Sequence, residues 1–84
     1  MDVFSVSVLH EDGEERYDDI VSVTIKTPSG EISVLAHHHP LVTIAKKGTV
    51  TCKTKHNGAR EIILARDSIF KVSPEGVMIL TIGF

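Results

Sequence analysis

The segment Val3–Leu9 has the sequence VFSVSVL, in which apolar and polar residues alternate. Phe4, Val6 and Val8 have even residue numbers, and the serines between them have odd ones. Because successive side chains of a β-strand point to opposite faces, this alternation is typical of a strand with one buried and one solvated face. We therefore expect Val3–Leu9 to form a strand whose larger side chains face a core.

The same alternation recurs along the chain. The sequence VSVTIK over residues 21–26 places Val21, Val23 and Ile25 on one face. No stretch of useful length has the 3.6-residue period of an amphipathic helix. Further strands are expected at residues 50–55, 60–65, 69–72 and 77–82.

Turn-forming residues separate these segments. Asn57-Gly58 is the strongest hairpin signal, because a tight two-residue turn needs positive φ at both central positions. Other turns are expected at EDGE, PSG, KKG and SPEG, which begin at residues 11, 28, 46 and 73. Short strands at regular spacing predict an all-β fold: a small antiparallel β-sandwich or flattened barrel of about eight to ten short strands, forming a single domain over residues 1–84.

Composition narrows the possible functions. The chain has 84 residues, 42% of them hydrophobic and 24% charged, which is the balance of one small globular domain. Its net charge of −2 does not favour a basic face for nucleic acid. A single cysteine, Cys52, excludes an internal disulfide. We expect no signal peptide at MDVFSVSVLHED and no membrane insertion, and hence a soluble domain on the cytoplasmic side.

Three adjacent histidines, His37, His38 and His39, raise the possibility of a metal site. In an extended segment His37 and His39 point one way and His38 points the other, so at most two converge locally. A catalytic zinc needs about three protein ligands around one point. The sequence does not bring His10, His56, Cys52 or a carboxylate to this segment, so we predict no physiological metal site, although adventitious nickel or zinc binding remains open.

Catalytic motifs are not evident. Cys52 lies on the same alternating face as Val50, which is typical of a small buried hydrophobe rather than a reactive thiolate. The sequence shows no glycine-rich phosphate loop, paired-carboxylate motif or serine elbow. We therefore predict neither enzymatic activity nor a cofactor.

The histidines lie within SGEISVLAHHHPLVTIAKKGTV, residues 29–50, and this stretch resembles the signature of the epsilon subunit of F-type ATP synthases, called delta in mitochondria. That signature has a turn glycine, a strand, a Leu-Pro-Gly-His-x-Pro-Leu run and a second short strand. The flanking strands resemble the family's opening and closing strands, so the resemblance spans nearly the whole chain. The residues that match the signature in order are Gly30, Glu31, Ile32, Val34, Leu35, His38, Pro40, Leu41, Val42, Thr43 and Gly48.

The chain also departs from that family. Ser33 replaces a usual glycine, Ala36-His37 replaces Pro-Gly, and Asp67-Ser68 replaces Gly-Gly. Each lost glycine removes a low-cost route to positive φ. The sequence stops at LTIGF, where the family usually continues into a C-terminal helical hairpin, so that hairpin's role is not assigned to this chain.

The resemblance implies particular docking residues. It implies that His38 faces the gamma subunit and that Glu31 faces the polar loops of the membrane c-ring. The alternative for His38 is a histidine that only packs within the fold. Phe70, Met78 and Phe84 are candidates for an apolar docking patch, although core packing is the favoured role for each of them.

The function implied by the resemblance is structural. The chain would be a non-catalytic central-stalk subunit of an F-type ATP synthase that links gamma to the c-ring. It would lie at the cytoplasmic face of the bacterial inner membrane as a peripheral part of that complex. Two alternatives are a free-standing β-sandwich adaptor derived from this domain and a small metal-binding protein that uses the histidines.

Overall fold

The computed structural model describes residues 2–84 and folds them into eight β-strands. The described part of the chain contains no helix that could span a membrane. The all-β prediction is confirmed. The strands are β1 (Phe4–His10), β2 (Gly13–Thr27), β3 (Gly30–Leu35), β4 (Leu41–Ala45), β5 (Gly48–Thr54), β6 (Ala59–Leu64), β7 (Ser68–Ser73) and β8 (Gly76–Leu80).

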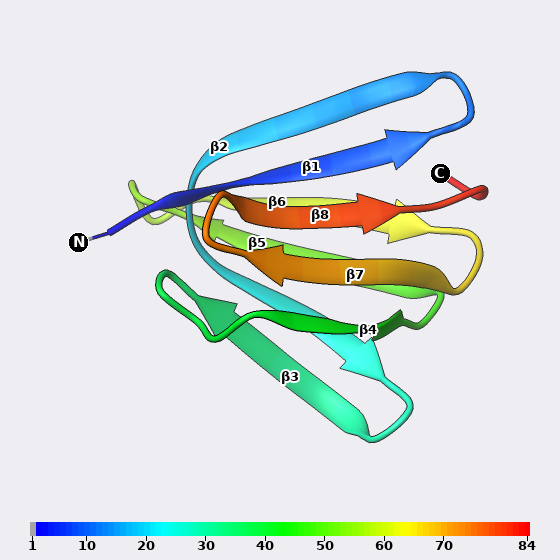
Figure 1. Ribbon diagram of the computed structural model, residues 1–84. Helices are drawn as coiled ribbons and strands as arrows, with labels where there is room; N and C mark the ends of the chain where they lie inside the picture. The colour runs from blue at the N-terminus through cyan, green and yellow to red at the C-terminus, as the bar shows by residue number, and fades with distance from the viewer. Residues whose placement is uncertain (1) are drawn as a thin grey trace.

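The strands form two layers that share the long strand β2 (Figure 1). The strand order is β4-β7-β8-β1-β2-β5-β6, and β3 also pairs with β2. The first half of β2 pairs with β1, whereas its second half lies between β3 and β5. One layer therefore contains β4, β7, β8, β1 and the start of β2, and the other contains β3, the end of β2, β5 and β6.

Among residues 2–84, all strand pairs are antiparallel except one. Strands β1 and β8 run parallel, with Val6 opposite Val77 and Leu9 opposite Leu80. The sequence predicted an antiparallel sandwich, and the parallel pair is a departure from it. Hairpin signals report only pairs of strands that are adjacent in the sequence, whereas β1 and β8 come from opposite ends of the chain.

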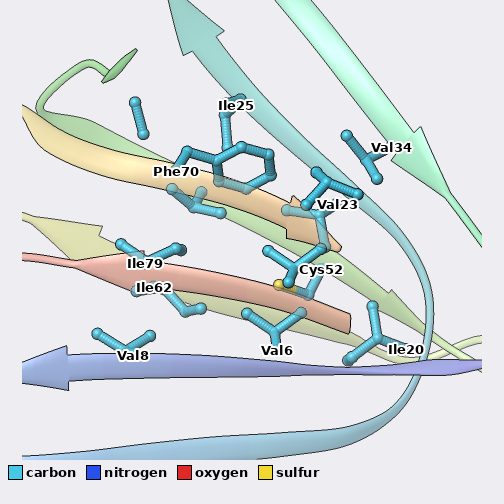
Figure 2. Packing of buried hydrophobic residues seen from close by; sticks show 14 of the residues in the cluster. Val6, Val8, Ile20, Val23, Ile25, Val34, Cys52, Ile62, Phe70 and Ile79 are labelled. Atoms are coloured by element: carbon cyan, nitrogen blue, oxygen red, sulfur yellow. The ribbon is translucent and has the colours of Figure 1, made fainter. Parts of the chain in front are cut away.

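The core lies between the two layers, and the inward residues of both contribute to it (Figure 2). Val6 and Val8 of β1 are completely buried, as the alternation of VFSVSVL predicted. Phe4 packs against the same cluster. The other buried hydrophobic residues are Ile20, Val23, Ile25, Val34, Ala45, Val50, Cys52, Ile62, Leu64, Phe70, Val72, Val77 and Ile79.

The bend in β2 corrects one prediction. Val23 and Ile25 are buried, but Val21 is half-exposed and Ile20 takes the expected core position. The pairing register shifts between Ile20 and Ser22, next to Asp19, whose φ is 58°. An extra residue in one strand changes whether the odd-numbered or the even-numbered residues face the core. The odd-numbered Val23 and Ile25 are therefore buried on one side of this bulge, whereas the even-numbered Ile20 is buried on the other side.

The β5–β6 hairpin also differs in detail from the prediction. Asn57 has a φ of 64°, but Gly58 does not have positive φ, so the tight two-residue turn is wrong. Residues 55–58 form a wider loop instead. The Thr54 N–H donates to the Gly58 carbonyl at 2.9 Å, and the Gly58 N–H donates to Thr54 Oγ1 at 3.0 Å. The Thr54 side chain thus accepts one of the two hydrogen bonds that close this loop, whereas backbone groups alone close a tight two-residue turn.

Candidate functional site

Glu31 is the second residue of β3 and is exposed at the end of the molecule formed by the β2–β3 turn. That turn is well ordered, because Thr27 Oγ1 donates to the Gly30 carbonyl at 2.7 Å and accepts from the Ser29 N–H at 3.2 Å. Lys26 is the cross-strand partner of Glu31 in β2. None of the ion pairs found among residues 2–84 uses the Glu31 carboxylate. It therefore presents a negative charge to solvent.

His38 lies in the β3–β4 turn and is exposed, so it does not pack in the core. Its N–H donates to the Leu35 carbonyl at 3.2 Å, and its ring Nδ1 lies 2.7 Å from the His39 carbonyl oxygen. The turn follows the last residue of β3, whereas Glu31 lies near the first (Figure 1). The structure therefore separates Glu31 and His38 by most of the length of one strand.

The three histidines do not act together. His37 Nε2 lies 2.7 Å from Asp2 Oδ2, while His38 bonds within its own turn. His10 lies at the end of β1 and stacks on Phe84, with ring centroids 4.8 Å apart. Within residues 2–84, no three His, Cys, Asp or Glu side chains are close enough to hold a metal ion.

Cys52 is completely buried in β5. Burial raises the pKa of its thiol to about 11, because the apolar core disfavours the charged thiolate. The thiol is therefore protonated at neutral pH, and protonated thiols are poor nucleophiles. Cys52 behaves as the small buried hydrophobe that its position beside Val50 predicted.

An exposed apolar row crosses the outer face of the β4-β7-β8-β1 layer. Ile44 lies opposite Ile69, Ile69 opposite Leu80, and Leu80 opposite Leu9. Ile44, Ile69 and Leu80 are 39%, 47% and 41% exposed. We call these four residues the outer row. Exposed apolar residues that lie side by side make this face a candidate for contact with another molecule.

Sequence analysis did not identify the outer row. The signal was present in IFKV and VMILTI, where apolar residues occupy both parities and not only one. Such runs are typical of strands that are covered on both faces. Phe70 is completely buried and therefore has the core-packing role that the sequence favoured over a docking patch, whereas Met78 is half-buried and Phe84 is 46% exposed.

A polar row crosses the outer face of the second layer. Ser33, Thr24, Thr51 and Glu61 follow one another across β3, β2, β5 and β6. The hydroxyls of Thr24 and Ser33 form a hydrogen bond of 2.8 Å. The two outer faces therefore differ, because the first carries apolar residues on four neighbouring strands, whereas the exposed Leu35 and Ile63 of the second lie opposite Ser22 and Thr49.

The fold is a small β-sandwich whose outer face on one layer carries the outer row. The chain belongs to the family "ATP synthase, Delta/Epsilon chain, beta-sandwich domain", whose model matches residues 3–83. It is 34% identical over 80 residues to the ATP synthase epsilon chain of Bacillus pumilus. That match covers 95% of this chain but 60% of the relative, so the chain spans about three fifths of the relative's length.

Solved structures support the fold. A chain in the structure of the Euglena gracilis mitochondrial ATP synthase, OSCP/F1/c-ring in rotational state 1, matches with a TM-score of 0.83 at 20% identity, covering 95% of this chain and 51% of that one. A chain in the Tetrahymena thermophila mitochondrial ATP synthase central stalk/c-ring structure matches with a TM-score of 0.76 at 12% identity, covering 94% and 63%. The resemblance noted in the sequence is confirmed at the level of family.

Proposed function

We propose that this chain is the β-sandwich part of a central-stalk subunit of an ATP synthase, with a structural and not a catalytic role. The observation that carries the proposal is the family match over residues 3–83. The two structural neighbours come from ATP synthases, one of them described as a central stalk/c-ring assembly, which is consistent with this role.

In this proposal the domain links the gamma subunit to the c-ring. Glu31 at one end of β3 contacts the polar loops of the c-ring, and His38 beyond the other end contacts gamma. Their separation along β3 supports two distinct contacts. The outer row contributes apolar docking area. A continuous hydrogen-bonded sheet between the contacts suits a part that must transmit torque without deforming.

The location follows from the role. As a peripheral part of the complex, the domain lies at the cytoplasmic face of the bacterial inner membrane. It reaches the membrane through the c-ring loops and not by its own insertion.

The test is reconstitution with defined partners. The purified chain is mixed with the gamma subunit and, separately, with detergent-solubilised c-ring from the same source, and binding is measured by size-exclusion chromatography. We expect a stable complex with gamma and a weaker, salt-sensitive complex with the c-ring. A folded chain that binds neither partner would instead favour the free-standing adaptor.

A further inference from the structure

A hollow of about 320 Å³ lies at the end of the sandwich that carries the β3–β4 turn. Three segments far apart in the sequence form it: the N-terminal arm with the start of β1, the end of β3 with the turn that follows, and the end of β7 with the β7–β8 turn. Its volume is near the lower end of the range for ligand pockets, which suits one large side chain. The apolar side chains that line it include Val3, Phe4, Val34, Pro40, Val72 and Val77.

The rim of this hollow is held in an unusual conformation. His37 has a φ of 65°, in the left-handed region that costs a non-glycine residue conformational energy. Its ring is joined to Asp2 of the N-terminal arm, with Nε2 and Oδ2 2.7 Å apart. The contact therefore ties the β3–β4 turn to the N-terminal arm, and both of these segments line the hollow. Strained backbone at a surface opening is a feature of binding sites.

His38 lines the same hollow, and its hydrogen bond determines which of its ring nitrogens can accept a hydrogen bond from a ligand. Nδ1 lies 2.7 Å from the His39 carbonyl oxygen. A carbonyl oxygen only accepts hydrogen bonds, so Nδ1 must carry the proton. In the neutral imidazole Nε2 is then an acceptor, and none of the hydrogen bonds found among residues 2–84 uses it.

We infer that this hollow receives one aromatic side chain of the protein that docks against the β3–β4 turn, with a ring N–H or O–H that donates a hydrogen bond to His38 Nε2. The inference rests on the proposed function, because it deepens the contact assigned to His38. The hollow is lined mainly by apolar residues and His38 supplies an acceptor, so it is complementary to a side chain with an apolar body and one donor. Tryptophan and tyrosine combine these properties, and both are enriched at the energetic centres of interfaces.

The acceptor is tested with a matched pair of small probes on the intact 84-residue chain. Indole has a ring N–H, and 1-methylindole has the same ring without that donor. We titrate each into ¹⁵N-labelled protein and follow the amide signals by NMR. Indole is expected to shift amides around the hollow with a dissociation constant of about 1 mM, and 1-methylindole to bind about fivefold more weakly.

Two variants test whether His38 is the acceptor that distinguishes the two probes. His38→Ala removes the acceptor and should abolish the difference between the two probes, whereas His56→Ala, in the β5–β6 loop, should preserve it. Equal binding of both probes to the wild-type chain, shifts confined to another surface, or no shifts at about 10 mM probe would each overturn the inference. The wild-type comparison stands even if a variant does not fold.

A final variant separates this inference from the stalk role. Ala36 lines the hollow and is half-buried, so Ala36→Leu should narrow it. We expect Ala36→Leu to weaken both indole binding and gamma binding about tenfold, with its melting temperature checked in parallel. If it blocks indole while gamma binds as before, the aromatic anchor is wrong but the stalk role stands. If wild-type chain binds indole but no gamma, the proposed function fails and the hollow belongs to another ligand.

Discussion

In the part of the chain that the structure describes, three non-glycine residues have positive φ, with values between 58° and 65°: Asp19, His37 and Asn57. Asp, His and Asn tolerate this region better than other residue types. Asp19 lies at the bulge of β2, and Asn57 lies in the β5–β6 loop. His37 stands where the resemblance to the epsilon family implies a glycine, the residue that adopts positive φ without steric cost. Of the three, only His37 also lines the hollow.

His37 allows strain to be separated from the Asp2 contact. His37→Gly and His37→Ala both lose the contact with Asp2, which is exposed and therefore worth about 0–1 kcal/mol. Only glycine adopts the positive φ without steric cost. We expect His37→Gly to be about 1 kcal/mol more stable than His37→Ala in urea denaturation. Equal stabilities would show that the turn relaxes and stores no strain.

A polar cluster on β1 and β2 makes a pH-dependent prediction. Ser5 Oγ donates to Asp18 Oδ1 at 2.6 Å, and Arg16 Nε donates to the same oxygen at 3.0 Å. These hydrogen bonds lower the pKa of Asp18 from its ordinary value of 3.8, because they favour the ionised form. A pKa that is lower in the folded state contributes stability above the ordinary value, and this contribution is lost as the pH falls through the folded value.

Asp18→Asn should therefore have a lower melting temperature than wild type at pH 7. The difference in melting temperature should shrink as the pH falls below 3.8, because the wild-type carboxylate then becomes protonated and, like the asparagine, carries no charge. Melting curves of both proteins between pH 7 and pH 2 measure it. The control is Asp12→Asn in the β1–β2 turn, whose carboxylate takes part in none of the ion pairs found among residues 2–84. A difference that persists undiminished at the acid end would rule out the carboxylate as its source.

At the scale of elements, β7 shows how one strand serves two surfaces. Phe70 points into the core and is completely buried, whereas its neighbour Ile69 lies in the outer row and is 47% exposed. A substitution at Phe70 would change the stability of the fold, so an effect on binding could not be separated from unfolding. Ile69 is therefore the residue at which docking is best separated from stability.

Ile69→Lys places a charge between Ile44 and Leu80. Because the side chain faces solvent in the isolated domain, we expect the free energy of unfolding to change by no more than about 0.5 kcal/mol. Burying the charge at an interface should weaken gamma binding by about 2 kcal/mol. Thr51→Lys on the polar outer face is the matched control and should change neither quantity. Unaltered gamma binding by Ile69→Lys would exclude the outer row from that interface.

At the scale of the whole molecule, the opposite ends of β3 should serve different partners. Glu31→Lys should weaken c-ring binding by roughly 0.2–1 kcal/mol, with an effect that fades at high salt, and leave gamma binding intact. His38→Ala should weaken gamma binding by about 1 kcal/mol or more and leave the c-ring contact unchanged.

Titrations of each variant against isolated gamma and solubilised c-ring test this separation, with melting curves recorded alongside. Both side chains are exposed, so neither substitution should shift the melting temperature appreciably. If His38→Ala lowers the melting temperature yet binds gamma normally, the residue serves the fold and not the interface.

Local patterns in the sequence determined much of this protein. The parity of Val6 and Val8 identified the core face of β1, and the position of Cys52 beside Val50 identified it as a core residue. The family, too, was evident from residues 29–50 and their flanks. These features were predictable because strand alternation and turn chemistry depend on residues close together in the chain.

Only the tertiary structure decided the rest. The parallel pairing of β1 with β8, the burial of Ile20 in place of Val21, and the alignment of Ile44, Ile69, Leu80 and Leu9 all depend on register between strands. The hollow beside His38 likewise requires three segments from separate parts of the chain. A single sequence contains the periodicity of each strand but not its register against a distant partner, because register is set by packing between the two layers.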